Sequence, residues 1–175
     1  MRLQFRSARP EDVPRIMELI GHAQRQLAAT GSDQWQNGYP AVADIAADLA
    51  AGVGRVLEAE AGVMAYGAVV YDGEPAYGAI EEGAWLSEGG ATGAYVVLHR
   101  LAVAPEAQRQ GTAARMLEET AQEARERGCR SFRVDTHALN GTMQRLLHRT
   151  GFVLCGRVHY PSGERLAYER WIDRA

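Results

Sequence analysis

A nearly uniform apolar segment from about Ala94 to Val103 constrains the fold of this chain more than any other feature. A short turn at Ala104–Ala107 follows it, and Gln108–Ala113 then opens a helix with one apolar face. A strand that is apolar on both faces is typical of the interior of a sheet whose two sides are covered. The segment therefore predicts an α/β (mixed α+β) protein with this strand near the centre of its sheet.

The residues after this strand predict a second strand parallel to it. A helix is expected over Ala113–Arg127, and Gly128 ends it because glycine tolerates the left-handed conformation of a C-terminal cap. A strand over Ser131–Asp135 follows, in which apolar residues alternate with Arg133. Two strands joined through a helix in this way pair in parallel, with a right-handed crossover.

The rest of the chain supplies further strands and helices. The first half predicts, in order, an edge strand, two helices and a hairpin: Leu3–Arg6, Pro10 to about Ala28, Val42–Leu49, Arg55–Glu60 and Val63–Tyr71. Asn140 caps a last helix, and Phe152–Tyr160 and Arg165–Trp171 form a closing hairpin. Since neither a repeat nor a linker interrupts this order, a single domain over residues 1–175 is expected.

Charge, hydropathy and cysteine content exclude several classes of protein. The net charge is −3, so there is no basic surface of the kind that binds nucleic acid. No apolar run approaches the roughly 20 residues that span a bilayer, and no secretory signal is visible, so a cytoplasmic protein without a membrane partner is expected. Cys129 and Cys155 stand singly without metal-ligand spacing, which predicts reduced, buried thiols and no metal.

The turn at Gln108–Ala113 is a candidate anion site. The first N–H groups of a helix have no partner inside the helix and point beyond its N-terminus, an arrangement that suits a pyrophosphate. The segment lacks the ending of a P-loop and has only one of the three glycines of the dinucleotide fingerprint. Alone, one glycine at a helix start favours a plain strand-to-helix turn; the apolar strand before it and the Asn-capped helix after it favour the anion site.

Two motifs resemble the GNAT superfamily of N-acetyltransferases. Leu-Ala-Val, Pro-Glu and Gln-Arg-Gln-Gly-Thr-Ala, within residues 101–113, resemble its acetyl-CoA-binding signature, Arg/Gln-x-x-Gly-x-Gly/Ala. Asn140-x-x-Met143-x-x-Leu146, which ends in Gly151-Phe152, resembles its second motif. The resemblance covers most of the chain and implies a twisted mixed sheet of about seven strands flanked by four helices. It also implies that the central parallel strands splay apart and hold a pantetheine arm.

The same resemblance implies which residues bind acetyl-CoA as a cosubstrate. Backbone groups of Leu101 and Val103 hydrogen-bond the pantetheine arm as an added strand does, and Asn140 also bonds it. The N–H groups of Gln110–Ala113 hold the pyrophosphate, where Gly111 permits close approach. The implied set is Leu101, Val103, Gln108, Arg109, Gln110, Gly111, Thr112, Ala113 and Asn140. Arg109, Arg145 and Arg149 are candidates for the 3′-phosphate, although each is equally consistent with a solvated helix face.

His99 is the first candidate for a catalytic base. Acetyl transfer to an amine proceeds by direct attack on the thioester, and a group must take the proton of the amine. Alternation along the strand places His99 on the face of Leu101 and Val103, and imidazole suits proton transfer near neutral pH. The surrounding string also resembles the matching strand of arylalkylamine N-acetyltransferases, which carries a catalytic histidine there. The alternative is a histidine with a purely structural role in a buried strand.

His137 and Asp135 end the neighbouring strand, where parallel sheets place ligands. Either could orient His99 or serve as the base, and His137 is the second catalytic candidate. The alternative is that the segment from Asp135 to Asn140 provides only turn and cap chemistry. The family's usual tyrosine acid is absent, because Leu147 occupies that position. No acid is therefore assigned, and the Leu101 N–H is the implied donor to the oxyanion.

Two variable segments are candidates for recognition of the acceptor amine. The loop from Thr30 to Pro40 contains Trp35 and Tyr39, which could form a face for an aromatic or cationic amine. The long polar segment Asp72–Gly93 is predicted to be functional or mobile, and it contains Trp85 beside acidic residues. The alternative for the tryptophans is that they pin loops onto the core.

The sequence thus predicts an acetyl-CoA-dependent N-acetyltransferase that acts on a primary amine, with a small molecule favoured as acceptor. A protein or peptide acetyltransferase is one alternative. A non-catalytic acyl-CoA-binding or sensing module is another, to which the missing tyrosine lends weight, and a structural protein without nucleotide is a third. A homodimer is left open, since dimers are the commonest assembly of soluble proteins.

Overall fold

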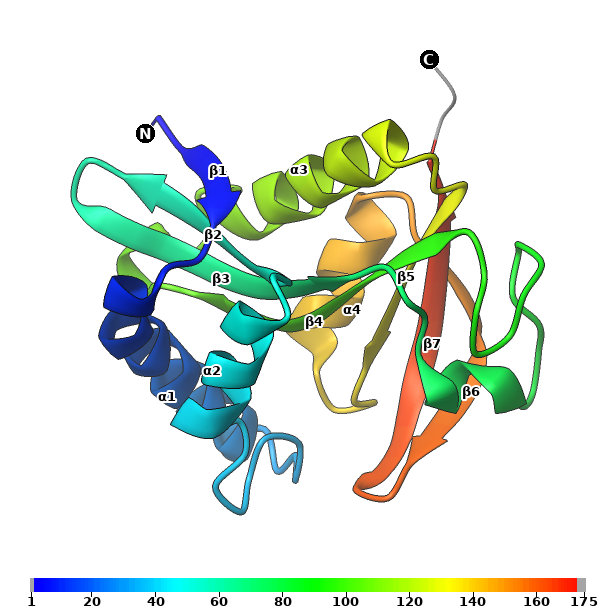
Figure 1. The fold of residues 1–175 in the computed structure, drawn as a ribbon. Helices are drawn as coiled ribbons and strands as arrows, with labels where there is room; N and C mark the ends of the chain where they lie inside the picture. Colours follow the sequence, from blue (N-terminus) through cyan, green and yellow to red (C-terminus); the bar gives the residue numbers. More distant parts are fainter. Residues whose placement is uncertain (1, 173–175) are drawn as a thin grey trace. The chain divides into compact units, whose positions relative to one another are not determined.

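The computed structural model describes residues 2–172 (Figure 1). Its strands and α-helices, in chain order, are β1 Gln4–Ser7, α1 Val13–Ala29, α2 Val42–Ala50, β2 Gly54–Ala59, β3 Gly62–Val70, β4 Tyr95–Val103, α3 Thr112–Glu126, β5 Ser131–Thr136, α4 Gly141–Arg149, β6 Val153–Tyr160 and β7 Gly163–Trp171. Short 3₁₀ turns lie at Pro10–Asp12, Pro75–Ala79 and Pro105–Ala107. Each α-helix and strand predicted from the sequence is present within a few residues of its expected bounds.

The strands form one mixed sheet in the order β1-β2-β3-β4-β5-β7-β6. β4 and β5 run parallel, whereas β1–β2, β2–β3, β5–β7 and β6–β7 are antiparallel. The predicted fold class, a seven-stranded mixed sheet with four helices, is therefore confirmed. The parallel ladder pairs Tyr95–Val97 with Ser131–Arg133, although β4 continues to Val103 and β5 to Thr136.

The chain divides into two compact units. The first unit comprises residues 1–69 and 99–119, and the second comprises residues 70–98 and 120–175. β4 and α3 each contribute residues to both units. The expectation of a single domain over residues 1–175 stays a prediction.

α1 and α2 lie side by side (Figure 1), and both contribute to the core of the first unit. Its fully buried members come from both helices, from β2 and β3, and from the end of β4: Ile16, Leu19, Ile20, Ile45, Val56, Tyr66, Ala102 and Ala104. Pro10 starts the turn before α1, where its missing N–H costs nothing. Arg6 forms ion pairs with Asp12 and with Glu58, which join β1 to this turn and to β2.

The core of the second unit contains Tyr77, Tyr95, Val97, Val158 and Ala167. On α4, the side-chain oxygen of Asn140 accepts the N–H of Met143 at 3.1 Å, so the predicted N-terminal cap is confirmed. The opposite face of this unit includes an edge-on contact between Phe132 and Phe152, with ring centroids 5.0 Å apart. These contacts fix α4 and the closing hairpin around β5.

The segment 72–93 is more ordered than its composition suggests. It contains the 3₁₀ turn Pro75–Ala79, and Glu81 exchanges two backbone hydrogen bonds of 2.8 Å with Arg157 on β6. The Ala84 N–H donates to the Cys155 carbonyl at 3.0 Å. The segment is therefore attached to the edge of β6 at the bulge between Leu154 and Gly156.

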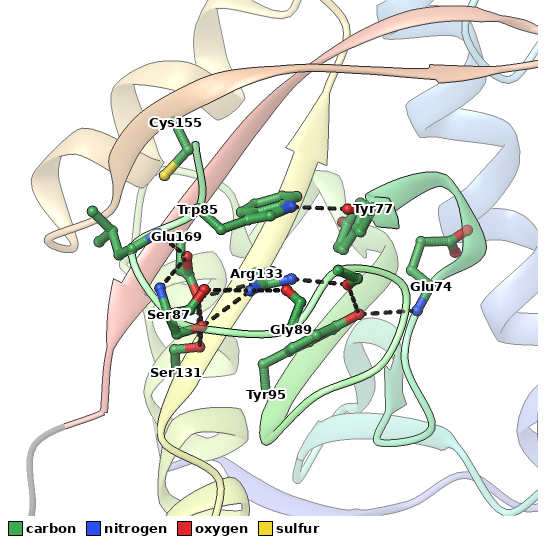
Figure 2. Close-up of polar contacts among 12 residues, drawn as sticks. Glu74, Tyr77, Trp85, Ser87, Gly89, Tyr95, Ser131, Arg133, Cys155 and Glu169 are labelled. Carbon is green, nitrogen blue, oxygen red and sulfur yellow. Dashed lines mark hydrogen bonds and ion pairs between the residues drawn. The ribbon is translucent and has the colours of Figure 1, made fainter. Parts of the chain in front are cut away.

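Arg133 holds the same segment from inside the second unit (Figure 2). Its side chain is 0% exposed and donates to Glu169, which is also 0% exposed, at 3.0 Å. Its Nη1 and Nη2 groups donate to the carbonyls of Ser87, Gly89 and Gly90 at 2.9–3.2 Å. Arg133 alternates with buried apolar neighbours, as expected. It is nevertheless buried, because the segment 72–93 covers its face of β5.

Candidate active site

The end of β4 carries the predicted base in the first unit. His99, Leu101 and Val103 are half-buried, whereas Ala102 is buried. Between them Arg100 adopts a left-handed conformation, with φ +55°. Such a conformation costs about 1–2 kcal/mol for a residue with a side chain, and it interrupts the pleat. Alternation alone therefore does not place His99 on the face of Leu101, and the catalytic role of His99 stays a prediction.

Contacts of the Arg100 side chain offset this backbone cost. Its Nε donates to Asp48 Oδ2 at 2.8 Å and its Nη2 donates to Asp48 Oδ1 at 2.5 Å, which is a bidentate ion pair. The Tyr66 hydroxyl donates to the same carboxylate at 2.5 Å, and burial together with this contact raises the pKa of Tyr66. The Asp48 side chain is thus a buried anion compensated by Arg100.

The same arginine reaches the loop predicted to contact the acceptor. Arg100 Nη1 donates to the Tyr39 hydroxyl at 2.8 Å. Gln24 on α1 donates to the Tyr39 carbonyl at 2.9 Å, and Trp35 packs partly against the core of the first unit. The structure therefore brings Tyr39 to the residue next to His99 on β4. Acceptor binding by Trp35 and Tyr39 stays a prediction.

The turn before α3 has the geometry of an anion cradle. Arg109 and Gly111 are both left-handed, with φ +58° and +81°. Alternation of left-handed and right-handed residues points successive N–H groups into one concavity. The Thr112 hydroxyl is buried and donates to the Ala107 carbonyl at 2.8 Å, which fixes the start of α3 relative to the 3₁₀ turn. The unpaired N–H groups of the first helical turn add to this concavity.

Two side chains close the back of this turn. The Gln108 amide donates to the Val103 carbonyl at 3.4 Å, and the Gln110 amide donates to the Glu106 carbonyl at 2.6 Å. A Cβ built on Gly111 would meet no protein atom within 4 Å. The preference for glycine at position 111 therefore arises from its positive φ, and the outer side of the turn is not filled by side chains. This cradle fits a pyrophosphate group.

The second unit carries His137, Asn140 and Trp85. His137 Nδ1 accepts the N–H of Leu139 at 3.1 Å, which is turn chemistry, and Asn140 uses Oδ1 as a helix cap. The ring of Trp85 lies 4.2 Å from the Arg133 guanidinium, and its N–H donates to the Tyr77 carbonyl at 3.0 Å (Figure 2). These contacts explain the three residues structurally, and their roles toward ligands stay predictions.

The resemblance places Leu147 where the related motif has a tyrosine. Leu147 is fully buried. The neighbouring His148 is exposed, and its ring lies edge-on to Tyr168 with centroids 5.6 Å apart. A leucine side chain has no proton to donate, so no acid is assigned at this position.

Several functional contacts were missed at the sequence level. Asp48 and Arg100 lie 52 residues apart, so no local pattern connects them. The available signal was a charged residue inside an apolar strand, which holds for both Arg100 and Arg133. Such a residue needs a buried counter-charge, and the sequence does not say which of 22 acidic residues supplies it.

Residues 2–172 contain neither a metal-binding cluster nor a membrane-spanning helix. No three His, Cys, Asp or Glu side chains in this range are grouped so that they could hold a metal ion. Within the same range, no helix has the length and apolar character needed to cross a bilayer. Cys155 is buried and Cys129 half-buried, and burial raises the pKa of both thiols.

Known proteins with related sequence and structure identify the arrangement. Residues 27–152 match the sequence model of the acetyltransferase (GNAT) family. A GNAT-family acetyltransferase from Streptococcus agalactiae is 35% identical with a TM-score of 0.84, over 98% of this chain and 96% of that chain. No curated protein sequence matches this chain.

Two more distant structures share the fold. The protein yncA of Salmonella typhimurium, solved with its cofactor acetyl-CoA, is 19% identical with a TM-score of 0.70, over 100% of this chain and 96% of that one. The ribosomal-protein-S18-alanine N-acetyltransferase of Escherichia coli is 17% identical with a TM-score of 0.62, over 99% and 96% of the two chains.

Proposed function

Because this chain belongs to the acetyltransferase (GNAT) family, we propose that it transfers the acetyl group of acetyl-CoA to a primary amine on a small molecule. Membership makes the chain an acyltransferase.

The geometry of the turn Gln108–Ala113 carries the proposal. Left-handed Arg109 and Gly111, together with the N-terminus of α3, direct N–H groups to one place, and the bond from Thr112 to Ala107 holds that place rigid. A pyrophosphate is the anion that such a cradle suits. The exposed Arg109 side chain adds a guanidinium at the rim, where it would meet a phosphate.

The remaining roles follow from the same strand. Acetyl-CoA supplies an activated thioester carbonyl. The backbone of Leu101 and Val103 would bind the pantetheine arm, and the Leu101 N–H would stabilise the oxyanion that forms during attack. His99 would remove the proton of the attacking amine. Asn140 retains its two side-chain N–H donors for the pantetheine arm while Oδ1 caps α4.

A small acceptor is favoured by the way the loop around Tyr39 is fixed. The Tyr39 hydroxyl is bonded to Arg100, and Gln24 bonds the carbonyl of the same residue. An aromatic side chain held in this way next to the catalytic strand suits an aromatic or cationic amine. Trp35 and Trp85 are the other proposed contacts.

Binding of acetyl-CoA is the first test. We expect acetyl-CoA to raise the thermal midpoint of the protein, because a ligand that binds only the folded state stabilises it. In Gly111→Ala, acetyl-CoA affinity should fall about 10-fold or more, as charge-assisted hydrogen bonds to the pyrophosphate are lost. Gly128→Ala is the matched control, because Gly128 has φ +79° and equally open surroundings at the far end of α3.

Release of CoA is the second test. Wild-type protein and acetyl-CoA are incubated with panels of small primary amines and of peptides with free N-termini. Turnover of small amines supports the proposal, whereas turnover of peptides alone would favour a protein acetyltransferase. If acetyl-CoA neither shifts the midpoint nor is consumed, the proposed function is wrong.

A further inference from the structure

A carboxylate at the carboxyl end of β5 is bonded by two tyrosine hydroxyls. The Tyr77 hydroxyl and the Tyr160 hydroxyl each donate to Asp135 Oδ2 at 2.7 Å. Both bonds use the same oxygen, so Oδ1 keeps its acceptor capacity. Asp135 is half-buried, and no ion pair involving it occurs among residues 2–172.

The tyrosines are rigid donors. Tyr77 is fully buried, with its ring 4.8 Å from that of Trp85 and 6.2 Å from that of Tyr95 (Figure 2). Arg133 lies over both of these neighbouring rings, at 4.2 Å from Trp85 and 3.9 Å from Tyr95. The buried pair of Arg133 and Glu169 thus fixes Tyr77, and Tyr77 in turn orients Asp135.

Charge favours a cationic partner for this carboxylate. Burial and then the charge of Asp135 raise the pKa of Tyr77 and of Tyr160, so both phenols stay neutral donors at pH 7. Arg133, two residues away, is already bonded to Glu169 and to loop carbonyls. The negative charge of Asp135 therefore lacks a compensating cation from the described chain.

The position of Asp135 is that of a ligand-binding residue. It lies two residues beyond Arg133, the last β5 residue that pairs with β4. In sheets with parallel strands, ligands bind beyond the carboxyl ends of the strands, where the pairing between strands stops. A carboxylate with one free oxygen at this point suits the amino group of an acceptor.

We propose that Asp135, oriented by Tyr77 and Tyr160, binds the acceptor through a hydrogen bond from the amino group to Oδ1. The inference rests on the proposed function, since it assigns the acceptor site of the same reaction. It makes Asp135 a substrate-binding residue and the two tyrosines positioning residues. It also predicts that the preferred acceptors carry a positive charge, and that neutral isosteres bind weakly.

Binding measurements test the inference without requiring turnover. The CoA-loaded protein is titrated calorimetrically with phenethylamine and n-hexylamine, each beside the alcohol that replaces the amino group by a hydroxyl. We expect the wild type to bind each amine about 10-fold or more tightly than its alcohol, and Asp135→Asn to lose that preference. Tyr160→Phe should weaken amine binding several-fold, because only one donor then orients the carboxylate.

Tyr71→Phe is the matched control. The Tyr71 hydroxyl donates to Glu123 at 2.8 Å in the same unit, so the substitution removes a similar bond away from Asp135. It should leave amine affinity unchanged. Affinity of each variant for CoA itself, and its far-UV circular dichroism, check that the fold is intact.

Failures of the two proposals are distinguishable. The inference is overturned if the wild type binds neither amine, binds amine and alcohol equally, or if Asp135→Asn retains wild-type amine affinity. It stands if amine preference depends on Asp135, even when no acetyl transfer is seen. Absence of CoA release with every amine in the panel, despite amine binding, would instead count against the proposed function.

Discussion

Arg133 lies between Phe132 and Val134 in β5, and its guanidinium is withdrawn from solvent. Glu169 on β7 supplies the counter-charge, and the rings of Trp85 and Tyr95 cover the guanidinium. Breaking a buried pair by removing one charge is costly, because the remaining ion keeps its desolvation penalty. This residue therefore links the stability of the second unit to the placement of the segment 72–93.

Glu169→Gln should destabilise the protein by about 3–5 kcal/mol, because it leaves Arg133 buried without a counter-charge. Urea unfolding monitored by circular dichroism measures this change. Glu164→Gln removes a carboxylate that pairs with Arg157 at the surface, and it should change stability far less than Glu169→Gln, because solvent screens an exposed pair. Equal effects of the two substitutions would contradict this account of Arg133.

His99 is the residue on which the proposed mechanism most depends. His99→Ala should lower kcat by about 10²–10⁴-fold, the usual contribution of a general base, while acetyl-CoA affinity is retained. Steady-state kinetics with the best amine of the screen, together with calorimetric titration of acetyl-CoA, measure the two quantities. An unchanged kcat would remove His99 from the mechanism, although the fold and the cradle would stand.

The two helices α3 and α4 begin with different local structures. α4 begins with the Asn140 side chain bonded to the Met143 N–H, whereas α3 begins at the left-handed turn that forms the cradle. The cap and the proposed contact with the pantetheine arm use different atoms of Asn140, so substitutions can separate them. The cap needs only the side-chain oxygen, whereas the pantetheine arm is proposed to need the side-chain N–H₂.

Asn140→Asp and Asn140→Ala should therefore differ. Aspartate keeps an oxygen at the cap, so stability should stay within about 0.5 kcal/mol, whereas alanine should cost about 1 kcal/mol. Both variants lose the amide donors, so both should bind acetyl-CoA more weakly. Thermal unfolding and calorimetry measure the two effects. Wild-type acetyl-CoA affinity in Asn140→Asp would rule out the proposed contact.

At the scale of the whole molecule, the two compact units share a strand and a helix. β4 passes from the second unit to the first between Leu98 and His99, and α3 passes from the first to the second between Glu119 and Thr120. A helix or strand gains its stability cooperatively along its length. Neither unit can therefore unfold without disrupting an element that the other needs.

Thermal or urea unfolding should accordingly show one transition. Trp35 reports on the first unit and Trp85 on the second, so variants that retain only one of the chain's three tryptophans, Trp35 or Trp85, can be followed by fluorescence. Their midpoints should coincide with each other and with far-UV circular dichroism of the same variant. Two separate midpoints would show that the units unfold independently.

Alkaline pH should unfold the protein through its tyrosines. The pKa is raised above its ordinary value of about 10 in Tyr66, Tyr71, Tyr77, Tyr95, Tyr160 and Tyr168, with burial as the largest cause in each. A raised folded-state pKa stabilises the protein below the unfolded-state pKa, and this stability is lost as the pH rises above it. Most of the ultraviolet absorbance of tyrosinate should appear together with loss of circular dichroism above about pH 10; formation of most of the tyrosinate while the fold persists would contradict this.

The local elements could be predicted because local patterns encode them. The Asn140 cap, the Gly128 terminus of α3 and the closing hairpin lie where turn chemistry and apolar periodicity indicated. The turn between β4 and α3, where the anion cradle is proposed, could also be located, since a strand, a turn and a helix start are consecutive in the chain. Arg100 escaped prediction because its left-handed conformation depends on Asp48, which approaches only in the folded chain.

By itself, then, the sequence determined the order of elements and the class of fold, because both depend on residues that are close together along the chain. Tertiary structure alone decided which charged and polar groups meet: Arg133 with Glu169, Arg100 with Asp48, and Asp135 with the hydroxyls of Tyr77 and Tyr160. The physical reason is that a buried charge needs a partner at hydrogen-bond distance, and contacts between residues far apart in the chain leave no periodic signal in the sequence.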